Sequence, residues 1–512
     1  MPSRDLPPRP HIDHLKHEAK ALLKSARAGD PDARARVRAT LGDTTPLKLT
    51  DAQRVIAREH GFPTWTRLAA HVQASRGDRE AVDAFLAAVQ QQDAARARDV
   101  LRAAPHIASS SLHVAAVLGF DREVARLIAA DPRRLSARAG EPAAEPLLYL
   151  GHSPFHGESA ERDAGLLASA RLLLEAGADP NTRDGRYGVP VLYAVTGQRS
   201  VLPIARLLLE AGADPTDGES VFHAAEHFHE EALELLLEYG VQLDHVGEWG
   251  NTALYFLLRW HDVAREPTVG QGVRWLLEHG ADPNVRSGAD AESALHVAVR
   301  RGQSADVVRA LLAHGADVQA RRADGSTAWL LARRAGRDDV AALLEEAGAA
   351  TQPLAPLDEL LAACSRGDAE AARRLGAPAL FERMSPTDRA LLLDAAADDR
   401  VVTALACLHA GFPLGEVDLM GATALHHAAI HGRASLVRAL ITAGADVHRR
   451  DREHDSTPLG WACFGSDFFP DSDGDYPDAV RALLEAGAEV RVAEHAPRHA
   501  GVRAVLGMGG GG

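Results

Sequence analysis

The chain is poor in lysine. Of its 512 residues only four are lysines, Lys16, Lys20, Lys24 and Lys48, and every later basic residue apart from histidine is arginine. A nucleotide-binding P-loop, a protein kinase and a pyridoxal enzyme each need a lysine, so these three classes are excluded after Lys48. No G-x-S-x-G nucleophile motif is present either. We therefore expect a non-enzymatic protein, with no catalytic residue and no cofactor.

Cysteine and long apolar runs are also scarce. The three cysteines lie far apart and none forms a C-x-x-C pair, which excludes a disulfide framework and a zinc ribbon and fits a reducing compartment. No apolar run is long enough to cross a membrane, and the first residues have no apolar signal core. These absences predict a cytoplasmic protein that does not contact a membrane.

What the chain does contain is an internal repeat. The run L-L-L-E-A-G-A-D-P-N at 172–181 returns as W-L-L-E-H-G-A-D-P-N at 275–284 and as A-L-L-E-A-G-A-E-V at 482–490. Its glycine recurs about every 33 residues, a period that predicts stacked supersecondary units with function spread over an extended surface.

A second motif precedes the first in several units. It reads S-S-L-H-V-A-A-V-L-G at 110–119, S-A-L-H-V-A-V-R-R-G at 293–302 and T-A-L-H-H-A-A-I-H-G at 423–432. Each run predicts a helix whose alanines allow close packing, while the leucine pair of the following helix fills the space between neighbours. The glycine after that second helix suits a left-handed C-terminal position. We expect Leu311 and Trp329 in this core.

The two motifs together resemble ankyrin repeats, of the kind found in bacterial multi-repeat proteins, over about residues 80–492. The resemblance implies an all-α solenoid of helix–loop–helix units joined by short β-turns. It also implies a scaffold that binds an unidentified protein partner through its concave face and its β-turn tips.

Residues 1–78 lack the repeat and predict a helical segment whose last helix spans Trp65–Ala74. Residues 1–77 carry 14 Lys or Arg against 8 Asp or Glu, whereas the remaining chain is acidic. The segment is either a cap on the first repeat, which we favour, or a small basic module that engages nucleic acid or another anionic surface. The acidic repeats argue against nucleic-acid binding by the body of the chain.

The repeats divide at a short segment that contains two prolines, 351–356. We predict about eight repeats in 79–352, about four in 353–495 and a flexible C-terminal tail in 496–512. Three units are lengthened, at about 151–166, 261–272 and 464–478, and we expect these insertions to loop outward and contribute to binding. The aromatics of the last insertion either fold back onto the repeats, which we favour, or are offered to a partner.

One motif supports a different class of function. His223-Ala-Ala-Glu226-His227 matches H-x-x-E-H, which in a metal-dependent hydrolase places two histidine ligands on one helix face. The same histidine also aligns with the repeat's own Leu-His motif, because Ser220-Val-Phe-His223 parallels Ser293-Ala-Leu-His296. We take it as the repeat histidine, expect no metal, and keep the metal-dependent protein as the alternative.

Partner-binding residues are predicted from the β-turn tips and the last insertion. Trp249 is the foremost candidate, because an exposed indole is an enriched interface anchor. We expect the partner to be a protein rather than nucleic acid or a membrane, and the chain to be a monomer. The predicted residues are Arg186, Glu248, Trp249, Asn251, Asp290, Glu292, Leu419, Met420, Glu453, His454, Phe468, Phe469 and Tyr476.

Overall fold

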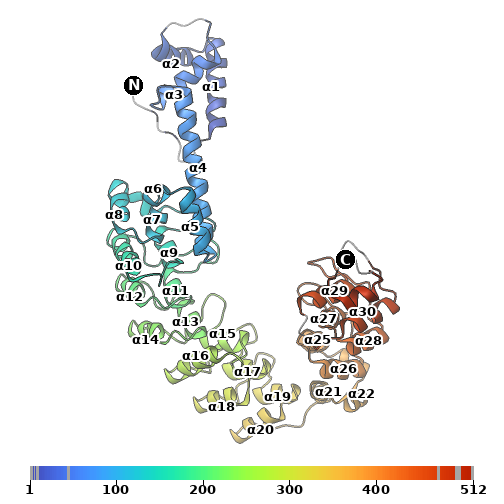
Figure 1. Cartoon of the computed structure of the whole chain (residues 1–512). Helices are drawn as coiled ribbons and strands as arrows, with labels where there is room; N and C mark the ends of the chain where they lie inside the picture. The colour runs from blue at the N-terminus through green and yellow to red at the C-terminus, as the bar shows by residue number, and fades with distance from the viewer. Residues whose placement is uncertain are drawn as a thin grey trace. The chain divides into compact units, whose positions relative to one another are not determined.

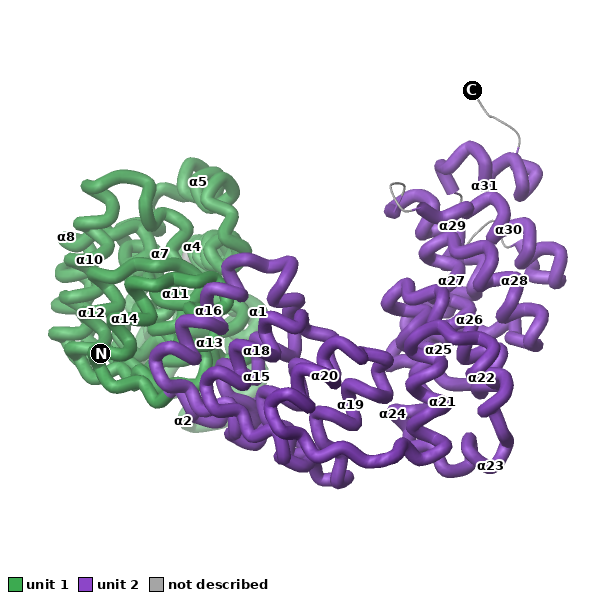
Figure 2. Tube along the Cα trace, turned by 90° about the horizontal axis from the view of Figure 1, so that it is seen from below, with its two compact units in different colours: residues 1–242 green, residues 243–512 purple. Residues whose placement is uncertain are grey.

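The computed structural model describes residues 4, 6, 11–42, 46–469, 473–490 and 497–508. They fall into two compact units, Met1–Gln242 and Leu243–Gly512, which Figure 2 colours separately. Within the described residues the regular structure is helical, and strand pairing is limited to isolated antiparallel bridges. The all-α fold predicted from the sequence is confirmed. No described helix combines the length and the apolar character needed to cross a bilayer.

Unit 1 begins with four helices. They are α1 (Ile12–Arg27), α2 (Pro31–Leu41), α3 (Leu49–Glu59) and α4 (Trp65–Gln90). The first three pack on one another and on the beginning of α4, around a core of their own that includes Leu15, Leu22, Val55 and Ile56. Their substantial contacts, among the residues that can be placed, are with each other and with α4 rather than with later helices. This packing favours a small module over a cap on the repeats.

Helix α4 is longer than the sequence predicts. It runs without a break past Ala74 to Gln90, and Figure 1 shows it as one long helix. The segment contains one glycine, Gly77, and no proline, and a single glycine costs a helix only about 1 kcal/mol. Arg76 and Glu80, four residues apart, form an ion pair at 2.8 Å across this point. The boundary predicted at 78/79 therefore falls inside a continuous helix.

The rest of unit 1 consists of helix pairs stacked in two rows (Figure 1). The inner row follows the second half of α4 with α7 (Leu112–Val117), α9 (Pro146–Gly151), α11 (Val191–Thr196) and α13 (Ser220–Glu226). The outer row is α5 (Ala94–Ala103), α8 (Asp121–Ala130), α10 (Ala160–Glu175), α12 (Leu202–Glu210) and α14 (Glu230–Glu238). The short helices α6 (Ile107–Ser110) and η1 (Pro132–Ser136) connect them.

Unit 2 has the same construction. Its inner row is α15 (Ala253–Trp260), α17 (Ala294–Arg300), α19 (Ala328–Arg334), α21 (Pro356–Ser365), α25 (Leu391–Ala397), α27 (Ala424–Ile430) and α29 (Pro458–Phe468). Its outer row is α16 (Pro267–Glu278), α18 (Ala305–Ala313), α20 (Asp338–Glu346), α22 (Ala369–Leu375), α26 (Val401–Ala410), α28 (Ala434–Thr442) and α30 (Tyr476–Glu485). The short helices are α23 (Pro378–Phe381), α24 (Pro386–Arg389) and α31 (Ala500–Val505).

The repeat motifs account for this construction. Leu311 of the leucine pair is fully buried and Trp329 is 5% exposed, so both lie in the core as predicted. Gly315, just after α18, has a φ of 83°, which permits the chain to leave the helix in a left-handed turn. The three cysteines are buried free thiols.

The predicted break at 351–356 lies within unit 2. Helix α21 packs directly against α19, and Arg334 Nε donates to Asp358 Oδ1 at 2.6 Å across the break. The division into two arrays at 352/353 stays a prediction. In the predicted tail, residues 500–505 form α31, because Val502 is buried against the neighbouring α30.

The first two insertions loop outward only in part, contrary to the expectation that they do so throughout. Ser153 and Phe155 are buried, and Ser153 Oγ donates to the backbone carbonyl of Val117 at 2.7 Å. In the second insertion Val263 is buried, and its N–H donates to Gln303 Oε1 at 3.1 Å. These buried residues fasten the insertions to neighbouring repeats, while residues 157–161 and 264–265 stay exposed.

Candidate interaction surface

The turns between repeats carry most of the predicted site residues. Four of them are closed by antiparallel bridges, at Ala139–Ala144, Arg183–Pro190, Ser287–Glu292 and Arg321–Thr327. An arginine before the turn ties it to the next repeat: Arg286 Nη1 donates to the carbonyls of Ala291 at 2.9 Å and Arg321 at 2.7 Å. The turn tips are thus held on fixed supports.

Ten of the predicted residues lie where a partner could reach them. Trp249 is 73% exposed and Leu419 is 99% exposed, values that are high for large apolar side chains. Met420 is partly buried and lines a groove described below. The exposed residues are Arg186, Glu248, Trp249, Asp290, Leu419, Glu453, His454, Phe468 and Phe469.

Glu292 is a correction, because it is 1% exposed rather than at an open tip. Its carboxylate accepts from Arg300 at 2.7 and 2.8 Å and from the Tyr255 hydroxyl at 2.9 Å, and lies 3.3 Å from Arg322 Nε. Burial favours the neutral acid, but these arginines and the tyrosine hold the pKa of Glu292 below its ordinary value. Glu292 therefore anchors the turn from inside.

Asn251 is a second correction. It is 8% exposed, because it stands between Gly250, which closes the turn with a φ of 70°, and Thr252, the N-cap of α15. Its carbonyl accepts the N–H of Gly247 at 3.0 Å. The exposed part of this turn is the preceding pair, Glu248 and Trp249.

Tyr476 is the third correction, since it is 2% exposed. Its ring lies against Gly432 and Gly465, where an added Cβ atom would meet it, and its hydroxyl donates to the carbonyls of Ile430 at 3.0 Å and Phe469 at 3.3 Å. The tyrosine has folded back as expected.

The phenylalanines of the same insertion behave differently. Helix α29 extends into the insertion as far as Phe468, whose ring stacks on Phe464 with centroids 4.3 Å apart. Phe464, Phe468 and Phe469 are 42%, 58% and 45% exposed, so the expectation that they fold back is wrong for Phe468 and Phe469. Pro470, Asp471 and Ser472 of the insertion lie outside the described residues.

A groove of about 590 Å3 lies beside these phenylalanines; we call it the C-terminal groove. Its walls come from α27, α29, Phe469 and two turns. They consist of Met420, His427, Ile430, His431, His454, Asp455, Ser456, Gly460, Trp461, Phe464 and Phe469. Among the described residues, neither arginine nor lysine lines it.

One buried carboxylate holds the groove in shape. Asp451 accepts from the backbone N–H groups of Glu453 at 3.0 Å and His454 at 2.6 Å, and from Trp461 Nε1 at 2.9 Å. Burial opposes ionisation, yet these hydrogen bonds hold the pKa of Asp451 below its ordinary value. The turn and the indole are thereby fixed before any ligand arrives.

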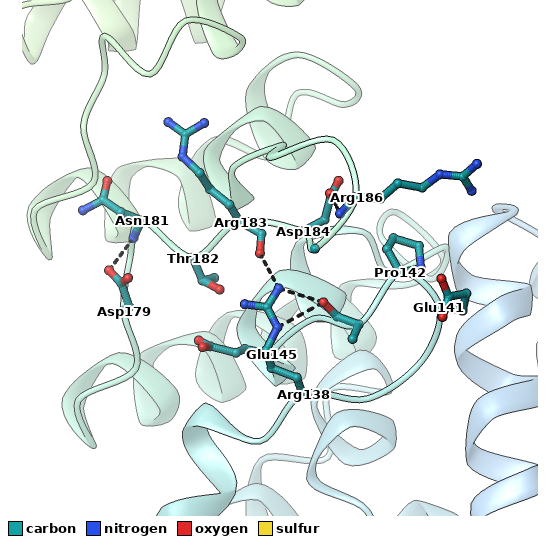
Figure 3. Close-up of a pocket in the computed structure, with 12 residues that line it drawn as sticks. Arg138, Glu141, Pro142, Glu145, Asp179, Asn181, Thr182, Arg183, Asp184 and Arg186 are labelled. Atoms are coloured by element: carbon teal, nitrogen blue, oxygen red, sulfur yellow. Dashed lines mark hydrogen bonds between the residues drawn. The ribbon is translucent and has the colours of Figure 1, made fainter. Parts of the chain in front are cut away.

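Unit 1 has a larger but polar pocket of about 810 Å3, between the turns 138–145 and 179–186. Figure 3 shows the Arg138 guanidinium directed at backbone carbonyls, and it donates to Ala143 at 2.7 Å and Arg183 at 3.1 Å. Asp184 Oδ1 accepts the N–H of Arg186 at 2.8 Å. These charges stabilise the turns, so the pocket offers no concentrated ligand chemistry.

The H-x-x-E-H match does not form a metal site. His223 Nδ1 lies 2.5 Å from Glu226 Oε2, and His227 Nδ1 lies 2.9 Å from the carbonyl of His223. Among the residues that the structure describes, no three His, Cys, Asp or Glu side chains converge as metal ligands. The described residues give no support to the alternative of a metal-dependent hydrolase.

His223 is also not the repeat histidine. Phe228 follows α13 and has a φ of 49°. It corresponds to Gly302, which follows α17 and has a φ of 70°. Six residues before Gly302 is the buried His296, and six before Phe228 is Phe222. Phe222 therefore occupies the histidine position, and His223 is one residue beyond it.

The comparisons with known proteins agree with the repeats. Models described as ankyrin repeats match residues 260–353 and 392–494, in the three-copy form, and residues 221–265, in the many-copy form. The chain contains ankyrin repeats within these residues.

Two animal proteins are among the similar curated proteins. Human protein phosphatase 1 regulatory subunit 27 is 41% identical over 76 residues, which cover 15% of this chain and 43% of that protein. Mouse ankyrin repeat and SOCS box protein 6 is 36% identical over 72 residues, 14% of this chain and 15% of that protein. The chain thus spans less than half the length of these relatives, and they give no support to a bacterial type of array.

Among solved structures, the ankyrin repeat domain of human ASB11 is similar. It is 26% identical, with a TM-score of 0.34, and the match covers 48% of this chain and 99% of that domain.

Proposed function

We propose that the chain is a non-enzymatic scaffold that binds a protein partner, as a monomer, through its inner-helix face, its turn tips and its last insertion. The observation that carries the proposal is the exposure of large apolar side chains on rigid supports. Trp249 and Leu419 stand at turn tips, and Phe468 stands at the end of α29. Such residues are costly to leave in water and are typical interface anchors.

The relatives support the same conclusion. One of them is named as a regulatory subunit of a phosphatase, and a regulatory subunit acts by binding another protein. The part of the chain that the structure describes brings together no constellation of the kind that hydrolytic metal chemistry needs.

The test is capture of binding proteins by the intact chain, followed by measurement of direct binding with each purified candidate. We expect one candidate to bind with a defined stoichiometry and to be weakened by Trp249→Ala or by Phe468→Ala. The proposal fails if no purified protein binds the intact chain, or if a bound protein is chemically converted and released.

A separate observation favours a second role for the N-terminal module. Lys16, Lys20 and Lys24 follow one another at intervals of four on the exposed side of α1, although Lys16 also pairs with Asp13 at 2.8 Å. A basic stripe of this kind attracts an anionic partner. The intact chain should bind heparin-agarose and elute at lower salt when the three lysines are changed to glutamine, and unchanged elution would exclude this role.

A further inference from the structure

The C-terminal groove combines apolar walls with an acidic surrounding. Phe464 and Phe469 supply exposed aromatic surface, and the buried Trp461 and the partly buried Ile430 complete the apolar walls. A volume of about 590 Å3 lies in the range of sites that enclose most of a bound group, and it exceeds what one side chain needs. The groove therefore has room for an apolar anchor together with the backbone on either side of it.

The floor of the groove is preorganised. The edge of the Trp461 ring is met by His427, with centroids 5.4 Å apart and planes at 82°. His427 Nε2 in turn lies 2.9 Å from Asp418 Oδ2. With Trp461 Nε1 held by Asp451, the indole has little freedom to collapse into the groove or to swing out of it. A ligand thus loses little affinity to ordering the site.

The charge around the groove is negative. Residues 411–490 contain 13 Asp or Glu against six Arg. Asp455 lines the groove with a side chain that is 85% exposed, and Glu453 is exposed on the same turn. Asp473 is exposed beside Gly474, which packs against Gly432 at the end of α27. Carboxylates therefore stand on the 453–455 turn and beside Gly474, which lies against the groove-lining His431.

Arg450 moderates this charge without cancelling it. Its Nη1 lies 3.4 Å from Asp455 Oδ2, and it also donates to the backbone carbonyl of Asp455. Its side chain is 24% exposed, so the guanidinium lies mainly behind the turn, whereas the carboxylate faces solvent. Arg452 is also exposed on this turn, so an incoming ligand meets two carboxylates, Glu453 and Asp455, and one guanidinium.

We propose that the C-terminal groove binds a short extended segment of a partner protein that carries a large apolar anchor, leucine, phenylalanine or tryptophan, flanked by lysine or arginine. The anchor lies between Trp461, Phe464 and Phe469. The basic flanks face Glu453 and Asp455 on one side and Asp473 on the other. This inference rests on the proposed scaffold function and assigns the chemistry of one of its partners.

The apolar and charged parts of the proposal have distinct consequences. Burial of the anchor supplies most of the affinity, because the aromatic walls lose contact with water. The exposed carboxylates steer the basic segment and hold its register, so their contribution weakens as salt rises. An acidic segment with the same anchor is repelled by the carboxylates.

The experiment selects ligands from a displayed library of random 12-residue peptides on the intact, immobilised chain. Enriched peptides are synthesised with a fluorescent label, and their affinity is measured by anisotropy at two salt concentrations. The test variants are Phe469→Asp, Ile430→Asp and the pair Glu453→Gln with Asp455→Asn. Phe120→Ala is the matched control, since it removes an aromatic ring that is 39% exposed just before α8 in the outer row of unit 1. Circular dichroism and thermal melts show that each variant is folded.

We expect the enriched peptides to share a large apolar residue with lysine or arginine nearby. Phe469→Asp and Ile430→Asp should each weaken binding at least about tenfold, as loss of a central anchor contact does. The double charge variant should weaken it about threefold at low salt and less at high salt, as expected for rim charges. Phe120→Ala should leave the affinity unchanged.

Three results overturn the inference: no enrichment, enriched peptides that are acidic or lack an apolar anchor, or peptides that bind Phe469→Asp as tightly as the unmodified chain. In each case the scaffold proposal survives if a purified partner protein still binds the intact chain. If no partner protein binds the chain at all, the scaffold proposal itself fails, whatever the peptides do.

Discussion

Asn284 joins one repeat to the next through the backbone at Asp317. Its Oδ1 accepts the N–H of Asp317 at 2.7 Å, and its Nδ2 donates to the carbonyl of Gly315 at 2.9 Å. Asn181 makes the same two contacts with Asp214 and Gly212 in unit 1. The recurring asparagine of the G-A-D-P-N motif is thus a side chain that completes the hydrogen bonding of the following turn.

Replacing Asn284 with alanine should destabilise unit 2. The change leaves the Asp317 N–H and the Gly315 carbonyl without their partner, and each net hydrogen bond contributes about 1 kcal/mol. We expect a loss of about 1–2 kcal/mol in urea unfolding, with the largest loss of hydrogen-exchange protection at Asp317. Asn284→Asp keeps the acceptor and should retain the protection at Asp317. Equal exchange at Asp317 in both variants would show that the side chain does not bridge the repeats.

Protonated His223 should stabilise unit 1. Burial opposes its charge, but hydrogen bonds to Glu219 and Glu226 raise the pKa of His223 from 6.5 to about 9. Because the folded pKa is the higher one, the contribution is complete below about pH 6.5 and is lost as pH rises through about 9. The melting temperature of the unmodified chain, relative to that of His223→Gln, should therefore fall between pH 7 and pH 9.5.

His227→Gln is the control for this measurement, since His227 is exposed and its Nδ1 lies 2.9 Å from a backbone carbonyl but 3.9 Å from Glu226 Oε2, the carboxylate that His223 contacts at 2.5 Å. Its melting temperature should follow that of the unmodified chain over the same pH range. A constant difference between the unmodified chain and His223→Gln across this range would contradict a raised pKa at His223.

Glu292 should be among the most sensitive turn residues of unit 2. Glu292→Ala leaves the arginines Arg300 and Arg322 without their buried partner, and the Arg322 side chain is only 11% exposed. Breaking a buried charge pair in this way costs about 3 kcal/mol or more. Asp290→Ala removes an exposed carboxylate that lies 2.9 Å from Arg322. It should lower the free energy of unfolding by at most about 1 kcal/mol. Similar losses in urea titrations of the two variants would refute the buried role of Glu292.

The repeat architecture is predictable because its signals are local. A leucine pair, a glycine that can adopt a positive φ and a Leu-His helix start each act within a few residues, and Leu311 and Trp329 lie in the core where the motif places them. The length of α4 was missed because one glycine, Gly77, is too weak a signal to end a helix. The register at His223 was missed because Phe228 adopts the positive φ that a glycine adopts elsewhere.

The candidate surface was harder to predict. The position of a residue in a turn indicates how close it is to the tip, but not which way its side chain points. The Glu292 side chain points inward because it forms ion pairs with Arg300 and Arg322. The C-terminal groove brings together Met420, Ile430 and Phe469, whose separation in the sequence hides their proximity. The sequence predicts Met420, His454 and Phe469 as separate binding residues. The stacking of two repeats brings them together around the C-terminal groove.

Tyr476 and Phe468 should separate the structural and recognition parts of the last insertion. Tyr476 is enclosed by Gly432 and Gly465, so Tyr476→Ala creates a cavity where α30 meets α27. Such a truncation lowers the free energy of unfolding by about 3–5 kcal/mol, and α30 should lose protection from hydrogen exchange. Phe468→Ala removes a ring that is 58% exposed and stacked on Phe464, so stability should change by less than about 1 kcal/mol. If Phe468→Ala instead unfolds α30 as Tyr476→Ala does, the phenylalanine is part of the core of the last repeat and does not belong to the surface that a partner contacts.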